Sequence, residues 1–298
     1  MSTLDAVAET KRGTVRKRSQ LKAIWFRYRK NKLAIFGLAL LTFMILVAIF
    51  ADVIVDYESQ VITQNIPERL QPPNKNHVFG TDHVGRDIFA RIVYGSRISI
   101  FLGLLTISIS LSAGSIIGAS AGYYGGRIDN ILMRVMDVFL AIPAILLAIS
   151  IVAALGPGLV NILIAMSVAQ IPRFARIVRS SIMSIMGQEF IEAAKACGTK
   201  DRRIIFRHII PNAIGPIIVQ ATLSMATTIL TISSLSFVGL GIEPPTPEWG
   251  AMLSDGRVQM RNFPHVVIIP GFAIMMAVLA LNLIGDGLRD ALDPKLKN

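Results

Sequence analysis

The sequence contains few charged residues and a single cysteine. Only 16% of its 298 residues are charged, whereas 53% are hydrophobic, and a soluble domain typically carries about 25% charged residues. Long uncharged runs alternate with short charged segments, which is the pattern of a chain solvated by lipid rather than one that buries a single globular core. The one cysteine, Cys197, excludes an intrachain disulfide and leaves no partner for a cysteine-based zinc motif.

Common motifs for nucleotide binding and for zinc-dependent hydrolysis are also absent. The sequence has no G-x-x-x-x-G-K-[ST] phosphate loop and no H-E-x-x-H. The interiors of the apolar runs lack Asp, Glu, Lys and Arg, which usually mark proton or ion pathways in membranes. We therefore expect a chain that is not an enzyme and not a proton-coupled carrier, so that any transport draws its energy from elsewhere. A membrane enzyme or a membrane docking protein is the alternative of another class.

Six segments are long enough to cross the hydrocarbon of a bilayer, which takes about 20 apolar residues. The run 33–51 exceeds the roughly 7–15 residues of a signal-peptide core, so we interpret it as a retained anchor. The uncharged run 138–172 is too long for one span, and Gly156-Pro157-Gly158 is a strong turn signal that divides it. The predicted spans cover residues 33–51, 98–122, 131–155, 158–178, 212–236 and 266–286.

Positive charge predicts the orientation of these spans. The net charge of +11 lies largely beside apolar runs, which is typical of cytoplasmic membrane flanks rather than of nucleic-acid binding. The basic tail 1–32 is therefore expected in the cytoplasm, and six spans return the tail 287–298 to the same side. The loops 52–97 and 237–265 then fall outside the cell.

The second run is rich in small residues. Small faces let helices approach closely in lipid, where packing rather than hydrophobicity drives association. The pattern fits packing within the chain and an interface with a second subunit equally well. The residues are Gly103, Ser108, Ser110, Ser112, Ala113, Gly114, Gly118, Ala119 and Gly122.

The cytoplasmic segment 187–211 is far longer than an ordinary connection of about 4–6 residues. Residues 188–197 favour a helix, with Glu189 and Glu192 near its start, where acidic groups suit the helix dipole. Gly198 follows at the position where a left-handed residue ends a helix. The sequence therefore predicts a helix that stops at a sharp glycine turn.

A second short helix is expected after this turn. Asp201 is placed to cap it and Pro211 follows its end. The first helix carries small and apolar residues on one face, which suits either a helix lying on the lipid surface or a helix docked in the groove of a cytoplasmic protein. The residues of that face are Phe190, Ala193, Ala194 and Cys197.

Three stretches carry a family resemblance. Glu192-Ala193-Ala194, with Gly198 four residues on and Ile209-Ile210-Pro211 beyond it, resembles the EAA loop of ABC importer permeases. His208 before that ending, and Asn212 after it, resemble the dipeptide/oligopeptide/nickel branch, from which Ile210 departs conservatively.

The other two stretches are FGTDHVGRDIFARIVYGSRISI, residues 79–100, and LSFVGLGIEPPTPEWGAML, residues 235–253. Both resemble motifs of the same branch, from which Ala90 and Val238 depart. The basic tail with the first span resembles the C-type subunit. The three stretches occur in the family's order and, with the tail, cover most of the chain.

The resemblance implies an all-α type I importer permease, with residues 98–287 as its transmembrane domain. It implies a heterodimer with a homologous B-type permease, two cytoplasmic ATPases that bind ATP and Mg²⁺, an extracytoplasmic solute-binding protein, and a bacterial or archaeal cytoplasmic membrane. This chain itself would need no cofactor. Peptide is the expected solute, with nickel or another small solute as the alternative.

The resemblance also assigns site residues. Those that would couple the ATPase are Glu189, Glu192, Ala193, Ala194, Gly198, Asp201, His208 and Pro211. The outer motif contains Gly80, Thr81, Asp82, Gly85, Arg86 and Asp87, and the loop near the pore contains Pro244, Pro245, Trp249 and Gly250. The residues that bind the solute are unknown.

The outer loop invites a metal interpretation that its spacing does not support. His77, Asp82, His83 and Asp87 match no metal motif. We expect instead a turn at residues 80–82 and an ion pair between Asp87 and an arginine or another neighbour. Trp249 has an alternative role as an anchor at the membrane interface.

Overall fold

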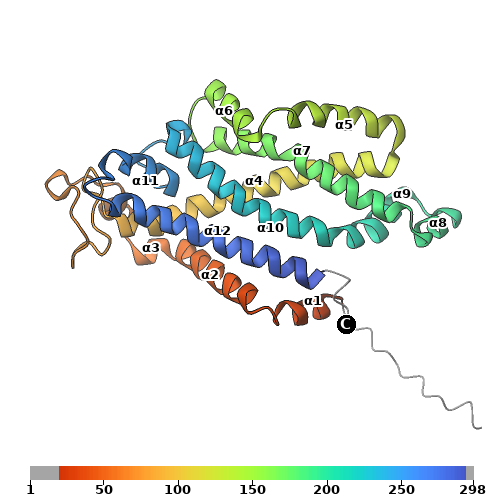
Figure 1. The fold of residues 1–298 in the computed structure, drawn as a ribbon, viewed down its shortest axis with the longest axis horizontal. Helices are drawn as coiled ribbons and strands as arrows, with labels where there is room; N and C mark the ends of the chain where they lie inside the picture. The colour runs from red at the N-terminus through yellow and green to blue at the C-terminus, as the bar shows by residue number, and fades with distance from the viewer. Residues whose placement is uncertain (1–19, 293–298) are drawn as a thin grey trace, which may run out of the picture.

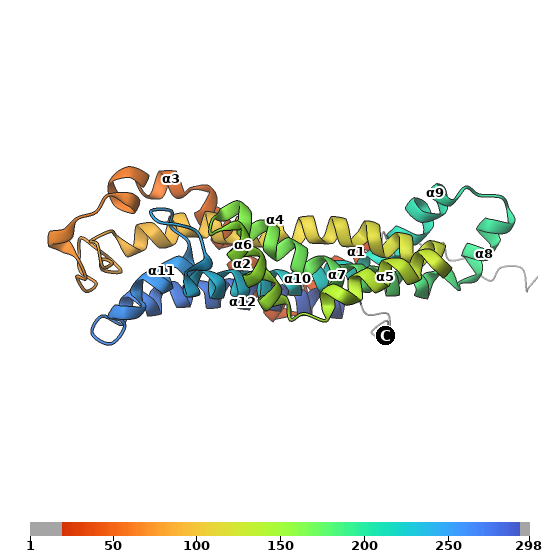
Figure 2. The same cartoon turned by 90° about the horizontal axis from the view of Figure 1, so that it is seen from above.

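The computed structural model describes residues 20–292 as an elongated helical bundle (Figures 1 and 2). The tail residues 1–19 and 293–298, which hold part of the predicted basic flanks, lie outside the described part. Within residues 20–292 the β structure is confined to one isolated bridge, between Thr81 and Asp87. The α-helices are α1 (Gln20–Tyr28), α2 (Lys32–Ile49), α3 (Ala51–Ile54), α4 (Ile88–Tyr124), α5 (Gly126–Leu140), α6 (Ala144–Leu155), α7 (Leu159–Met186), α8 (Glu189–Ala196), α9 (Asp201–Ile204), α10 (Ile210–Leu235), α11 (Trp249–Gly256) and α12 (His265–Leu292).

Short helices of other types join these elements. The π-helical segments are η1 (Tyr57–Ile62), η3 (Ile205–Ile209) and η4 (Ser236–Leu240), and the 3₁₀ segments are η2 (Ile66–Glu68) and η5 (Arg257–Gln259). Because η3 and η4 continue α9 and α10 without a gap, residues Asp201–Leu240 form one helical segment.

Five helical segments are long and apolar enough to cross a membrane, namely α2, α4, α7, Asp201–Leu240 and α12. The third predicted span, residues 131–155, is not one helix. It consists of α5 and α6, which are bent by 81° at residues 141–143. Pro143 accounts for the break, since proline lacks the N–H of a helical hydrogen bond and clashes with the preceding turn.

Several helices extend beyond the predicted spans. Helix α4 begins at Ile88, inside the predicted outer loop, and α7 continues to Met186 rather than ending near residue 178. With 37 residues, α4 is about 55 Å long at 1.5 Å per residue, which exceeds a hydrocarbon layer of about 30 Å. Apolar runs predict where a helix meets lipid, whereas these helices continue into the loops.

The turn at Gly156-Pro157-Gly158 is confirmed. Gly156 and Gly158 have φ values of +89° and +135°, which favour glycine. The Asn161 amide donates to the carbonyls of Leu155 and Gly156 at 3.0 and 3.1 Å. The N–H of Gly158 donates to Gly241 at 3.1 Å, which joins this turn to the end of η4.

The glycines of α4 pack inside the chain. A Cβ on Gly114 would lie 2.6 Å from the Phe174 Cβ, and one on Gly118 would lie 2.3 Å from the Ala175 carbonyl, both on α7. A Cβ on Gly103 would meet Ile229 of α10 at 2.7 Å. These glycines therefore serve contacts between helices of one chain, whereas Ser108 and Ser112 are exposed.

Candidate functional site

The predicted helix and glycine turn in segment 187–211 are confirmed. Helix α8 ends at Ala196 with Cys197 as its C-cap, and Gly198 has a φ of +71°. The N–H groups of Gly198 and Thr199 donate to the carbonyls of Lys195 and Ala194 at 2.9 and 3.1 Å, which is the Schellman arrangement for a helix end. Helices α8 and α9 lie together at one end of the bundle (Figure 2).

Helix α8 is fixed by one buried residue and leaves its opposite face open. Ile191 is fully buried and packs in a cluster with Ile204 and Ile209 from the helical segment that follows. Phe190, Ala193, Glu192 and Cys197 are exposed, and Ala194 is half-buried. The face predicted for docking is therefore available to a partner, and the buried face connects α8 to the long segment Asp201–Leu240.

Two details of this segment differ from the prediction. Asp201 does not cap a helix, because its carboxylate accepts a hydrogen bond from the Tyr123 hydroxyl at 2.6 Å and the cap residue is Lys200. Pro211 does not follow the end of a helix. It lies within the continuous helical segment Asp201–Leu240, directly after η3, where a local π-helical turn accommodates the missing N–H.

His208 also has a defined place. Its ring lies 6.4 Å from that of Phe190, between centroids, and its carbonyl accepts the Asn212 amide at 2.6 Å. The imidazole therefore connects the start of α8 to η3. Glu189 lies in the first turn of α8, as predicted.

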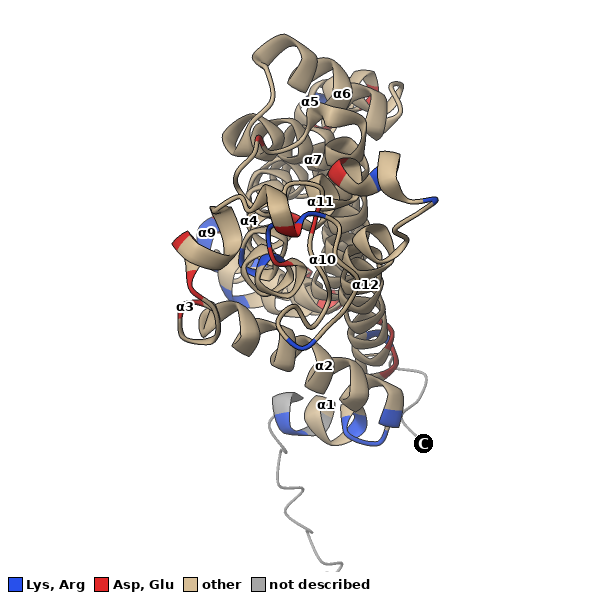
Figure 3. Ribbon diagram, turned by 90° about the vertical axis from the view of Figure 1, so that its left-hand side faces the viewer, with Lys and Arg blue, Asp and Glu red and all other residues tan. Residues whose placement is uncertain are grey.

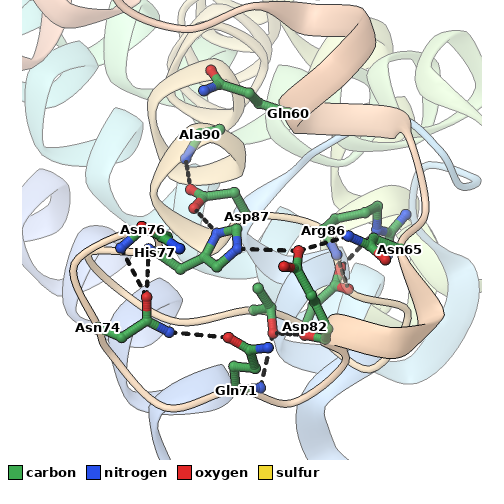
Figure 4. A network of polar contacts seen from close by, with 12 residues as sticks. Gln60, Asn65, Gln71, Asn74, Asn76, His77, Asp82, Arg86, Asp87 and Ala90 are labelled. Carbon is green, nitrogen blue, oxygen red and sulfur yellow. Dashed lines mark hydrogen bonds and ion pairs between the residues drawn. The ribbon is translucent and has the colours of Figure 1, made fainter.

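At the other end of the bundle, the outer motif forms a hydrogen-bonded cap before α4 (Figure 4). Thr81 is fully buried, and its hydroxyl donates to the Glu68 carbonyl at 2.5 Å and accepts from the Gln71 N–H at 2.8 Å. Gly80 and Gly85 have positive φ values, and a Cβ on Gly85 would lie 1.8 Å from the Asn65 carbonyl oxygen. The turn predicted at residues 80–82 is thus built on close backbone contacts.

Asp87 contacts a neighbour, as expected, but that neighbour is His77 rather than an arginine. Asp82, rather than Asp87, pairs with Arg86, with 2.6 Å between Oδ2 and Nε. Asp87 instead lies 2.7 Å from Nδ1 of His77, and its other oxygen accepts the Ala90 N–H at 2.8 Å as the N-cap of α4. An N-cap acceptor one turn before an apolar run is a recognisable sequence signal.

Loop residues 244–250 are anchored inside the fold rather than at a membrane interface. Trp249 is 1% exposed, and its indole N–H donates to the Ile92 carbonyl at 3.1 Å. The role of interfacial anchor is therefore wrong. A Cβ on Gly250 would lie 2.5 Å from the Ser233 Cα, so α11 packs closely against α10. In Figure 3, which looks onto this end, both acidic and basic residues lie around α11.

Two buried charged residues were not singled out by sequence. Arg91 donates to the carbonyls of Val61 and Pro245 at 3.1 and 3.3 Å, which joins η1 to the loop before α11. Glu248 is fully buried and accepts the N–H groups of Gly250 and Ala251 at 2.9 and 2.8 Å. Burial raises the pKa of the Glu248 carboxyl. Glutamate is uncommon as a helix N-cap, so the sequence gave little indication that Glu248 caps α11.

The cap does not gather metal ligands. Within residues 20–292, no group of three or more His, Cys, Asp or Glu side chains is arranged to hold a metal ion. His77 instead lies between two carboxylates, with its Nε2 3.5 Å from Glu68 Oε2 and its Nδ1 against Asp87.

Comparison with known proteins decides the family. Residues 114–298 match the model of the binding-protein-dependent transport system inner membrane component. The chain belongs to this family. Residues 19–73 match the N-terminal transmembrane domain of oligopeptide transport permease C. The family's members are multi-pass transport subunits rather than enzymes.

Relatives cover nearly the whole permease. It is 53% identical to the dipeptide transport system permease protein DppC of Alkalihalophilus pseudofirmus, over 91% of this chain and 88% of that one. It is 40% identical to the di/tripeptide permease protein DppC of Pseudomonas aeruginosa, over 94% of both chains. It is 44% identical to the glutathione permease protein GsiD of Escherichia coli, over 92% of this chain and 90% of that one.

Solved structures support the fold. An inward-facing structure of the MetNI methionine ABC transporter matches 69% of this permease and 98% of its own chain, with a TM-score of 0.51 and 21% identity. An amino acid ABC transporter matches 66% of this permease and 92% of its own chain, with a TM-score of 0.53 and 16% identity. The permease therefore has the all-α type I ABC importer fold.

Proposed function

We propose that this permease is one of two homologous membrane subunits of an ATP-driven importer for di- and oligopeptides in a bacterial cytoplasmic membrane. The names of its relatives, which are dipeptide, di/tripeptide and glutathione permeases, support a peptide solute. Each subunit would form half of the pore. Nickel or another small solute is the alternative, and uptake assays distinguish the two.

The exposed face of α8 carries the proposal for ATPase docking. Ala193 presents a small surface beside Phe190 and Cys197, which suits close packing in the groove of a partner protein. Ile191 packs against Ile204 and Ile209, so a displacement of α8 would move the helical segment that continues to Leu240. ATP binding and hydrolysis in the partner would in this way reach the outer end of the bundle.

The remaining partners follow from the family. Two cytoplasmic ATPases would hold ATP and Mg²⁺, with no cofactor bound by this chain. An extracytoplasmic binding protein would deliver the solute at the outer end, where the loop with Pro244 and Pro245 lies beside the cap. Both termini and the segment 187–211 would face the cytoplasm, as the distribution of Lys and Arg indicates.

The thiol of Cys197 provides a direct test, because it is exposed and is the single cysteine of the chain. We expect a membrane-impermeant maleimide to label it in inside-out vesicles but not in right-side-out vesicles. Addition of the ATPases should slow labelling. The control is a thiol placed by Val258→Cys in a Cys197→Ser background, on an exposed residue of the outer end. This thiol should be labelled in right-side-out vesicles, and the ATPases should not change its labelling rate. Equal labelling of Cys197 with and without ATPases would contradict docking at α8.

Two variants of the turn test its role in coupling. Gly198→Val combined with Ala194→Trp should abolish ATPase association and ATP-driven uptake, because valine is strained at a φ of +71° and tryptophan enlarges the docking face. Gly198→Asn is the matched control, since asparagine tolerates the left-handed region. Intact association and uptake in the double variant would overturn the coupling role.

A separate assay identifies the solute, namely the uptake of labelled peptides and of Ni²⁺ in a deletion strain.

A further inference from the structure

Tyr123, near the end of α4, contacts the helices on both sides of the Gly198 turn. Its hydroxyl donates to the Asp201 carboxylate of α9 at 2.6 Å. The ammonium of Lys195 on α8 lies 5.8 Å from the centroid of its ring, within the range of a cation–π contact. The side chain is half-buried, and the ring packs against the apolar cluster that fixes α8. One side chain of α4 therefore meets both α8 and α9.

The end of α4 that carries Tyr123 is in close contact with α7. A Cβ on Gly118 would lie 2.3 Å from the Ala175 carbonyl oxygen. A Cβ on Gly122 would lie 3.0 Å from the carbonyl oxygen of Arg179. The two backbones therefore approach each other closely over the last two turns of α4, as small residues allow. Because Tyr123 follows Gly122 directly, a force on the Tyr123 side chain acts on α4 and on the α7 backbone packed against it.

Helix α4 connects this region to the outer cap without interruption. Its 37 residues, Ile88–Tyr124, are all α-helical, which gives a length of about 55 Å at 1.5 Å per residue. At its other end, Asp87 is the N-cap, and Arg91 donates to the Pro245 carbonyl at 3.3 Å. In Figure 1, α4 runs from the outer end of the bundle towards the end that holds α8 and α9. The segment Asp201–Leu240, by contrast, contains the π-helical stretches η3 and η4.

The hydrogen bond between Tyr123 and Asp201 is the directional contact at this junction. The apolar contacts of the cluster are non-directional, so they hold α8 and α9 against the bundle without fixing their position along it. A hydrogen bond has a preferred length and angle, and one to a carboxylate is roughly twice as strong as one between neutral groups. A displacement of α9 is therefore passed to Tyr123.

We propose that Tyr123 is a positioning residue for coupling, through which a displacement of α8 and α9 moves α4 and with it the outer cap. The proposal rests on the docking of an ATPase at α8 inferred above. It adds a second connection to the outer end, besides the segment Asp201–Leu240. Tyr123 itself lies outside the docking face, which consists of residues of α8 and its C-cap.

The ratio of ATP hydrolysed to peptide imported tests this role. Tyr123→Phe removes the hydroxyl and keeps the ring. In liposomes that hold the complete importer, we expect ATPase association to stay unchanged, while the ratio rises about threefold or more because the lost hydrogen bond involves a charged group. The matched control is Tyr124→Phe, since the neighbouring Tyr124 is 57% exposed and its variant should leave the ratio unchanged. A ratio in Tyr123→Phe equal to that of the unmodified importer would overturn the proposal.

A double-mutant cycle shows whether Tyr123 acts through Asp201. Asp201→Ala should raise the same ratio, and Asp201→Asn, which keeps an acceptor oxygen, should raise it less. Because both changes remove one contact, Tyr123→Phe combined with Asp201→Ala should raise the ratio no further than Asp201→Ala alone. Independent effects that multiply would overturn the proposal. So would a lower unfolding temperature of Tyr123→Phe in detergent with an unchanged ratio, which would indicate a role in stability alone.

The failure of this proposal is distinguishable from the failure of the proposed function. If the ATPases do not associate with the unmodified permease, or if ATP drives no peptide uptake, the proposed function is wrong and the role of Tyr123 with it. If the unmodified importer couples ATP hydrolysis to uptake, and Tyr123→Phe and Tyr124→Phe have the same ratio, only the role of Tyr123 is wrong.

Discussion

The Nε atom of Arg86 lies 2.6 Å from Oδ2 of Asp82, and both side chains are largely buried. The same guanidinium reaches Asp255 of α11 at 3.4 Å. The loop before α4 and helix α11, which are far apart in sequence, are thereby joined through one cation. The outer motif of this permease is thus a structural cap that fixes the start of α4 against α11.

Removal of one partner of this pair should destabilise the permease. We expect Asp82→Asn to lower the free energy of unfolding, by less than the about 3–5 kcal/mol of a fully uncompensated buried charge, because the buried Arg86 guanidinium keeps only its longer contact with Asp255. Thermal unfolding in detergent measures the loss. Asp52→Asn is the control, since Asp52 pairs with Arg97 in an exposed position, where ion pairs contribute little. Equal losses in the two variants would contradict a buried cap.

Gly85 should not accept a side chain. Gly85→Ala places a Cβ at 1.8 Å from the Asn65 carbonyl oxygen at a φ of +84°, so we expect the variant to accumulate poorly in membranes and to unfold at lower temperature. Gly187→Ala, at an ordinary φ of −83° and with no neighbour within 4 Å, should behave as the unmodified protein does. Normal accumulation of Gly85→Ala would show that the cap can relax.

The contact between α4 and α7 should be equally sensitive to size. Gly118→Ala introduces a Cβ at 2.3 Å from the Ala175 carbonyl, and overpacking of this kind costs about 1–3 kcal/mol. We expect a lower unfolding temperature in detergent. Ser112→Ala, on an exposed position of the same helix, should leave the midpoint unchanged. An unchanged midpoint for Gly118→Ala would place that glycine at a looser contact.

Glu248 should give the permease a measurable pH dependence. Its pKa in the folded state is raised above the ordinary 4.5 by burial. Its stabilising contribution is therefore fully present below about pH 4.5 and is lost as the pH rises through the folded-state value. We expect Glu248→Gln, which keeps an acceptor oxygen, to reduce this dependence. Glu248→Leu, which loses both acceptors, should destabilise at every pH. The same pH profile in Glu248→Gln and the unmodified protein would assign the dependence to another group.

Features that depend on neighbours in sequence were predictable. Local backbone preferences predict the turn at Gly156 and Gly158. They also predict the helix that ends before Gly198 and the left-handed conformation of Gly198 itself. The apolar runs likewise predict the segments that meet lipid. The partners of Asp82 and Asp87 were not predictable, since sequence spacing places arginines near both but does not say which side chain faces inward. The bend at Pro143 was missed because an uncharged run looks the same whether its helix is continuous or broken.

The sequence by itself determined that this is a multi-pass membrane permease with an exposed helix–turn–helix, because hydrophobic run length, glycine positions and motif order are local properties. Only the tertiary structure decided where the small residues of α4 pack, that Trp249 is buried, and that α5 and α6 are bent by 81° at their junction. These outcomes depend on which surfaces face one another across the bundle. Contacts between residues as distant as Gly118 and Ala175 arise from helix packing, and no local pattern encodes them.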